Sequence, residues 1–228
     1  MLGSLSSARL IGRLVAPDID VTTVAKTLES GDRFEISSAS ATAVRIQVGT
    51  RWGLLTGLLD GLKVAVPMLV ARSLGEPLVV QVAIAAGGLI GHVWPVYHRF
   101  RGGRGESPTY GALLVFDPLG VIVATLLGSA AGFLAGHVLV LRWSGLVVLA
   151  GWFAVVRDGP LLVAYTVFAI LLYAWASRPE LRQLAALSKK GVPPSNEEIA
   201  RELAMGARLG RALDTKSIPA LVRRLRTR

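Results

Sequence analysis

Between residues 52 and 176 the chain alternates long apolar runs with short polar segments. A helix needs about twenty apolar residues to cross the hydrocarbon layer of a bilayer. Membrane-spanning helices are therefore predicted at residues 52–73, 77–97, 119–136, 144–156 and 161–176, with a loop at 137–143. Residues 109–116 are too few to span alone, and Asp117–Pro118 separates them from the next run. The pattern predicts an all-α polytopic membrane protein.

The first fifty residues give a weaker signal. Residues 1–16 are apolar but are interrupted by Arg9 and Arg13. They fit either the cytoplasmic end of a helix whose outer half is missing or an amphipathic helix at the membrane interface. Residues 17–51 are polar, and we expect them in water or among the headgroups. Their Ser/Ala run from Ser37 to Thr42 fits either a loop around a ligand or a plain linker.

The chain beyond Arg178 is basic and differs from the apolar part. We predict a membrane domain at residues 1–185 and a basic cytosolic tail with an amphipathic helix at 186–228. Ser195 and Glu198 have the spacing of a capping box, and an apolar stripe follows at Ile199, Leu203, Leu209 and Leu213. The tail is interpreted as an anchor on an anionic membrane surface, against the alternative of a solvated helix with a disordered end.

Composition supports the membrane assignment. The chain is 52% hydrophobic, has a mean hydropathy of +0.54 and contains 25 glycines. Its net charge is +10, and most basic residues outside the tail fall in loops at one end of the predicted spans. The positive-inside rule places loops 17–51, 99–108 and 137–143 and the carboxy terminus in the cytosol. With so many apolar segments, an anionic membrane is the expected partner rather than nucleic acid.

Some chemistries are excluded or disfavoured by residue counts. The chain has no cysteine, which excludes disulfides, thiolate catalysis and Cys-ligated metals. Its three histidines are too spread for a metal site.

The glycine-rich loop after residue 98 has residues suited to phosphate binding. Arg99, Arg101 and Arg104 surround the three glycines Gly102, Gly103 and Gly105. Glycines let backbone N–H groups approach an anion, and guanidiniums neutralise it. The alternative is a positive-inside loop that only fixes topology.

Two charges lie inside the first predicted span. Asp60 and Lys63 are spaced i, i+3 and so share a helix face. They fit either a functional site or a structural ion pair. A small transporter is one functional hypothesis for the chain, and it rests on these two residues alone.

Two segments, LLDGLKVAVP at 58–67 and GHVWPVYHRFRGGRG at 91–105, identify a resemblance to a known family. They resemble motifs of the bacterial acyl-phosphate-dependent glycerol-3-phosphate acyltransferases, the PlsY family. The likeness covers about residues 2–185. It implies a seven-helix-type transmembrane bundle with a truncated first helix, six full spans and a cytosol-facing site in the bacterial plasma membrane. It also implies acyl transfer from acyl-phosphate to glycerol-3-phosphate, giving lysophosphatidic acid for phospholipid synthesis, without metal or cofactor.

The resemblance also assigns roles to residues of this chain. It implies three catalytic residues, Ser38, Arg104 and Ser144. It implies phosphate binding by Arg45, Lys63, Arg101, Gly102, Gly103, Arg104 and Gly105. Asp60, His92 and Arg142 would support them.

The chain departs from the family pattern at several positions. Arg101 and Arg104 replace lysines, the segment Glu35–Ser40 replaces a glycine-rich loop, and the third motif is shifted so that Ser144 lies one place off. Ser177–Leu181 lacks the family's histidine and asparagine, and Glu106 follows the loop where a small residue is usual. Two hypotheses follow: a divergent acyltransferase, or a non-catalytic relative that binds a lipid precursor or a partner enzyme.

Overall fold

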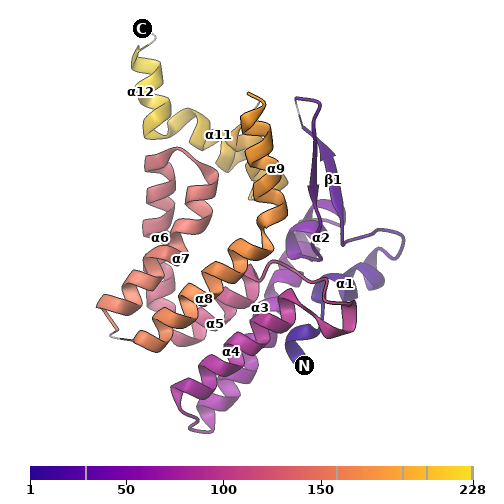
Figure 1. Cartoon of the computed structure of the whole chain (residues 1–228), viewed down its shortest axis with the longest axis vertical. Helices are drawn as coiled ribbons and strands as arrows, with labels where there is room; N and C mark the ends of the chain where they lie inside the picture. Colours follow the sequence, from indigo (N-terminus) through magenta and orange to yellow (C-terminus); the bar gives the residue numbers. More distant parts are fainter. Residues whose placement is uncertain (29, 158, 192, 204, 227–228) are drawn as a thin grey trace.

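The computed structural model describes residues 1–28, 30–157, 159–191, 193–203 and 205–226. A short 3₁₀ turn, Leu2–Ser4, and helix α1 open the chain, and a hairpin follows (Figure 1). The elements before the long helices are α1 (Ser7–Val15), β1 (Val24–Thr27), β2 (Arg33–Ile36) and α2 (Ala41–Gln47). The apolar helices are α3 (Thr50–Ser73), α4 (Leu78–Val93), α5 (Glu106–Phe116), α6 (Pro118–Ala135), α7 (Val138–Val155) and α8 (Pro160–Ala176). The basic end forms α9 (Arg178–Lys189), α10 (Asn196–Glu202), α11 (Ala207–Lys216) and α12 (Ile218–Arg226).

Among the described residues, four helices are long and apolar enough to cross a membrane: α3, α4 with the turn that follows it, α6 and α7. The pair α8 and α9, bent by 60°, gives a fifth candidate. The predicted all-α polytopic fold is confirmed. The expected six full spans exceed the number that length and composition support here, because α5 has only 11 residues and Asp117 ends it.

Small residues let the long helices pack closely. A Cβ on Gly111 of α5 would meet the backbone of Gly61 in α3, and one on Gly128 of α6 would meet Gly145 in α7. Such contacts are the usual means of helix association in lipid. Large side chains such as Phe153 fill the core between these contacts, while others such as Leu126 and Leu171 are exposed on the outer surface.

The chain start packs against the bundle. Gly3 lies against Gly88 of α4, where a Cβ would collide with the Gly88 carbonyl. In α1, the Ser7 hydroxyl donates a hydrogen bond to Asp60 of α3 at 2.9 Å.

Residues 17–51 are more structured than their polarity predicted. β1 and β2 form an antiparallel hairpin in which Phe34 and Ile36 are buried and pack near Leu187 of α9. The Gln183 side chain bonds both backbone groups of Glu35, each at 2.8 Å. The polar pattern of residues 17–51 did not indicate this hairpin, because alternate apolar residues of β2 bury against the distant helix α9.

The predicted loop at 137–143 was also wrong. Gly136, with φ +65°, makes the turn after α6, and His137 caps α7 by accepting a hydrogen bond from Leu139 N at 3.2 Å. Arg142 thus lies inside α7 and is buried. Its charge indicated a loop, but an acidic partner on another helix compensates the charge.

The tail folds back onto the bundle instead of forming one separate helix. The predicted capping box of Ser195 and Glu198 opens α10. The predicted stripe is split between α10 and α11, and Ile199, Leu203 and Leu213 are buried against Val138 at the start of α7. The proposed boundary at 185/186 falls inside α9. Figure 1 shows α11 and α12 beside one end of the α6–α7 pair.

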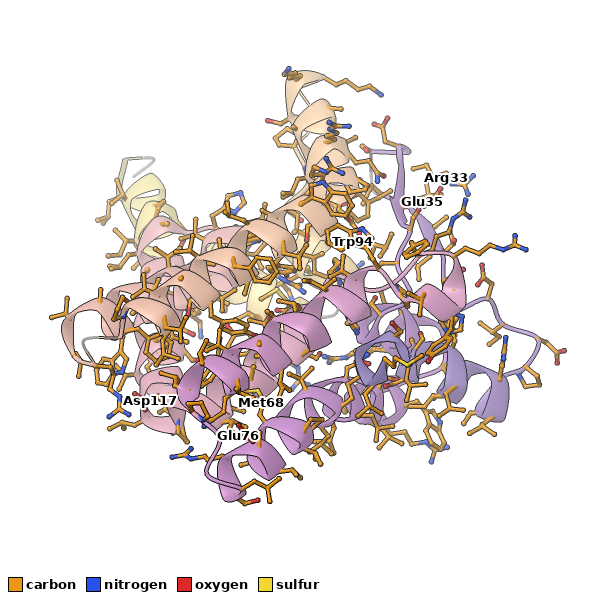
Figure 2. All side chains as sticks on the ribbon, turned by 60° about the horizontal axis from the view of Figure 1, so that its bottom comes forward. Arg33, Glu35, Met68, Glu76, Trp94 and Asp117 are labelled. Carbon is orange, nitrogen blue, oxygen red and sulfur yellow. The ribbon has the colours of Figure 1, made fainter. Side chains whose placement is uncertain are left out.

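The two ends of the molecule carry different loops. Figure 2 shows Glu76 and Asp117 near one end, and Arg33 and Glu35 of β2 at the other. Trp94, at the end of α4, lies toward the hairpin side. The glycine-rich loop that follows it leads directly into α5.

Candidate active site between α3 and α5

An apolar groove of about 910 Å³ runs between α3 and α5. Gly57 and Gly61 leave the α3 side open, and leucines and alanine cover the walls. The apolar side chains that line it are Leu58, Leu62, Ala65, Leu69, Leu114 and Val115. Arg72 and Pro118 lie at one end, and Glu106 and Ser107 are the polar lining residues from the start of α5. The groove can therefore hold an extended hydrocarbon chain.

A polar pocket of about 370 Å³ adjoins the groove. The two cavities share the lining residues Gly57, Leu58, Glu106 and Ser107. The pocket adds Thr42 and Arg45 from α2 and Arg142 from α7, while Leu203 and Met205 of the tail form part of its wall. An apolar channel thus leads into a cavity that has two guanidiniums and two hydroxyls.

Arg142 joins three parts of the chain at this pocket. Its guanidinium pairs with Glu106 of α5 and bonds the hydroxyl of Tyr173 in α8. It also donates to the Leu203 carbonyl at 3.4 Å. The Tyr173 hydroxyl donates to the same Glu106 oxygen at 3.3 Å, and its ring stacks on Trp143 at 4.4 Å. Because the Arg142 side chain is buried and its charge is paired, the guanidinium is held in one place.

Arg104 is buried behind the polar pocket. Its guanidinium donates to the Thr42 hydroxyl at 2.7 Å, and only 5% of the residue is exposed. It lines a small inner cavity of about 20 Å³ together with Tyr173, Ser177 and Glu180. Ser177 Oγ and Glu180 Oε2 have no hydrogen-bond partner within the described residues.

The glycine-rich loop lies on the other side of the Arg104–Thr42 contact. A loop pocket of about 360 Å³ is lined by Arg9, Ser38, Arg101, Gly102 and Gly103 among others. Trp94, Phe100 and Trp175 also line it. The hydroxyl and amide of Thr22, which lines this pocket, bond Asp20 and hold the pKa of that carboxyl below its usual value.

The loop glycines serve close packing. A Cβ on Gly102 would collide with the carbonyl oxygen of His92, and one on Gly103 with the imidazole of the same residue. Gly105 has φ +93° and makes the turn into α5. The three arginines do not share a cavity: Arg104 is buried, Arg101 is exposed at the loop pocket, and Arg99 is exposed and lines none of the described pockets.

Comparison with known proteins identifies the family at this point. A family model described as glycerol-3-phosphate acyltransferase matches residues 1–187. The chain belongs to the glycerol-3-phosphate acyltransferase family.

Relatives agree with this membership, and two solved structures share the fold. A glycerol-3-phosphate acyltransferase of Geobacter sulfurreducens is 33% identical over 192 residues, covering 81% of this chain and 89% of the relative. One of Syntrophotalea carbinolica is 35% identical over 153 residues, covering 63% and 74%. The crystal structure of PlsY, an integral membrane glycerol 3-phosphate acyltransferase, in its glycerol 3-phosphate form has the same fold. Its TM-score is 0.65 at 23% identity, with 81% of this chain and 87% of that chain covered. The lysophosphatidic acid form gives a TM-score of 0.64.

The structure divides the family-based site residues between pockets. Arg45 and Arg142 line the polar pocket, whereas Ser38, Arg101, Gly102 and Gly103 line the loop pocket. The Ser38 hydroxyl donates to Ser40 Oγ at 3.3 Å, next to the cap of α2. The Ser144 hydroxyl donates to the Gly128 carbonyl at 2.8 Å, within the α6–α7 contact.

Asp60, Lys63 and His92 form a buried network under the glycine-rich loop. The Lys63 ammonium lies 2.8 Å from each of Asp60 Oδ1, His92 Nδ1 and the Leu5 carbonyl. These contacts occupy all three donors of the ammonium. In this arrangement the ion pair joins α1, α3 and α4, and the pairing of Asp60 with Lys63 that the spacing predicted is confirmed.

Three residues of the polar pocket were missed by the sequence analysis. Thr42 and Ser107 gave no signal beyond their small polar side chains. Glu106 was noted only as an acid beside a basic loop. The shared position of these residues depends on α2, α5 and α7 meeting in space, which no spacing along the chain indicates.

Proposed function

We propose that this family member transfers an acyl group from acyl-phosphate to glycerol-3-phosphate and releases lysophosphatidic acid and phosphate. The observation that carries the proposal is the apolar groove that runs into a cationic pocket. An acyl-phosphate has an apolar chain and an anionic head, so one such molecule would occupy both cavities. Transfer also requires the donor carbonyl and the acceptor hydroxyl about 3–3.5 Å apart in one cavity.

The polar pocket supports this alignment. Acyl-phosphate is an activated mixed anhydride, so the protein mainly has to place the hydroxyl and stabilise anionic charge. Arg45 and Arg142 supply positive charge, and Thr42 and Ser107 supply hydroxyl donors. Fixed donors in a partly buried cavity stabilise a developing oxyanion more than the same donors do in water.

The orientation that fits this chemistry places the polar pocket and the tail on the cytosolic side of the bacterial plasma membrane. A soluble glycerol-3-phosphate would then enter from the cytosol while the acyl chain stays in the lipid layer. The basic loops at this end favour the same orientation.

The end of the tail suits an anionic membrane surface. Ile218, Leu221, Val222 and Leu225 are exposed along one face of α12, at the i, i+3, i+4 and i+7 positions. Arginines interrupt these positions in the sequence IPALVRRLR. An exposed apolar face on a helix of basic sequence is typical of a helix lying in the headgroup region.

A substitution in the groove tests the proposal. Ala65 lies eight residues along α3 from Gly57, about 12 Å in a helix. We expect Ala65→Phe to lower kcat/KM for palmitoyl-phosphate by about tenfold or more and to spare octanoyl-phosphate, because only the longer chain passes this point. The measurement is lysophosphatidic acid formed by purified protein in lipid nanodiscs.

The matched control is Val66→Phe. Val66 is the next residue of α3, is 50% exposed and does not line the groove. The Val66→Phe variant should have the same kcat/KM as the wild type for both acyl donors. Binding of palmitoyl-phosphate without any turnover by the wild type would instead indicate a non-catalytic relative.

A further inference from the structure

Glu106 lies where the groove and the polar pocket meet. It is one of the four residues that line both cavities. Among the described residues that line either cavity, it is the only carboxylate, and none is a histidine. A hydroxyl that attacks a donor in the groove would therefore find one carboxylate at the junction.

The two oxygens of the Glu106 carboxylate have different surroundings. Oε2 accepts hydrogen bonds from Arg142 and from the Tyr173 hydroxyl. Within the part of the chain that the structure describes, Oε1 accepts none, and 33% of the side chain remains accessible. One oxygen thus fixes the group while the other can accept a proton from a molecule in the pocket.

The backbone also fixes this position. Gly105, in the left-handed region, makes the turn that starts α5 at Glu106. An acidic side chain in the first turn of a helix is stabilised by the helix dipole. The titratable groups that face it are Arg142 of α7, Tyr173 of α8, Tyr110 one turn later in α5 and Arg45 of α2.

We propose that Glu106 is the general base for the acceptor hydroxyl, an assignment that rests on the acyl transfer proposed above. The acceptor oxygen bonds to the acyl carbon while its proton moves to Glu106 Oε1. The bond from the acyl carbon to the phosphate oxygen then breaks, and phosphate leaves with the electron pair. The proton passes from Glu106 to the departing phosphate, which restores the carboxylate.

The test compares Glu106→Gln with the wild type in nanodiscs, using palmitoyl-phosphate and glycerol-3-phosphate. Gln keeps an oxygen that can accept from Arg142 but is not a base. We expect kcat to fall by about a hundredfold or more, with both KM values within about twofold. Asp117→Asn is the control, because this carboxylate also pairs with an arginine, Arg157, but lines neither the groove nor the polar pocket.

The pH profile separates a base from a structural carboxylate. The base must be deprotonated, so wild-type kcat should rise with pH through one ionisation and then level off. Glu106→Gln should lack that rise, while Glu106→Asp should retain it at lower kcat. Formate should partly restore kcat to Glu106→Ala, which a structural role would not allow.

Different results identify different failures. A folded Glu106→Gln variant with kcat near that of the wild type, or with a loss confined to KM, would overturn the assignment of the base alone. Absence of turnover in the wild type would overturn the proposed function, and the base with it. If Glu106→Gln fails to fold, a lack of formate rescue in Glu106→Ala decides against the base.

Discussion

Some side chains that line the polar pocket also make contacts that stabilise the fold. Arg142 contacts Glu106, Tyr173 and Leu203, which belong to three different segments. Removing one partner of a buried ion pair typically costs about 3–5 kcal/mol, because the other charge is left unpaired. Arg142 is therefore a poor choice for separating chemistry from stability. Arg45, at the last turn of α2, is the other guanidinium of the polar pocket and offers a second probe of phosphate binding.

Arg45 and Arg101 allow a direct comparison of the two cationic pockets. Arg45 lines the polar pocket and Arg101 the loop pocket. We expect Arg45→Gln to lower kcat/KM by about a hundredfold, because a fixed cation near the reacting phosphate is lost. Arg101→Gln should have a much smaller effect. Initial rates with both substrates varied would measure this, and a larger loss for Arg101→Gln would move the site to the loop pocket.

At the level of residues, the sequence predicted contacts within one helix better than contacts between helices. The Asp60–Lys63 pair follows from i, i+3 spacing and is present. We expected one site formed by Arg99, Arg101 and Arg104, because they are close in the sequence. The structure does not bring them together. In a loop, side chains three residues apart can point to different cavities, so nearness in sequence does not define a site.

Between elements, the approach of α3 and α5 determines the groove. Gly61 and Gly111 are in backbone contact, and a Cβ on Gly111 would lie 2.5 Å from the Gly61 carbonyl oxygen. The two helices are therefore close where these glycines meet, and Leu62, Ala65 and Leu114 line the adjacent groove. A small increase in side-chain volume at this contact must push the helices apart.

Gly111→Ala tests this contact. We expect it to destabilise the protein by about 1–3 kcal/mol through overpacking and to lower activity with long acyl chains. Gly151→Ala in α7 is the control, because no atom lies within 4 Å of its added Cβ. That variant should be neutral or slightly more stable, since alanine favours helix over glycine by about 1 kcal/mol. Thermal inactivation in detergent would compare the two, and equal midpoints would contradict the packing argument.

Hydropathy predicted the long helices well and the connections poorly. The runs at 52–73 and 161–176 match α3 and α8 within two residues at each end. The start of α7 was misplaced, because a single arginine gave the pattern of a loop although Glu106 pairs with it. The β1–β2 hairpin was missed because its burial depends on α9, about 150 residues later in the chain. Local patterns do not contain such distant partners.

For the whole molecule, the tail is the part that lies outside the family match. The matched region ends at residue 187, whereas α10 and α11 follow it and pack against the α6–α7 turn. Through Leu203 and Met205 this added segment forms part of the polar pocket wall. The tail therefore covers one side of the cavity in which the proposal places the acyl-phosphate head.

A chain ending at Lys190 tests this wall. We expect it to remain in the membrane and to release severalfold more free fatty acid per lysophosphatidic acid formed, because water then competes with the acceptor. The control is the full chain with Leu221→Ser and Leu225→Ser, which leaves α10 and α11 packed in place. That control should keep the product ratio, because Leu221 and Leu225 do not line the polar pocket. If the shortened chain gave the same ratio of free fatty acid to lysophosphatidic acid, the tail would not act as a wall of the pocket.

The hydrogen bond between Arg142 and the Leu203 carbonyl also has a consequence for biosynthesis. A ribosome makes Arg142 and inserts its helix about sixty residues before Leu203 emerges. During that interval the rest of α7 and all of α8 are made, while one side of the pocket is still missing. The pocket would thus be completed only after the apolar helices up to α8 have been made.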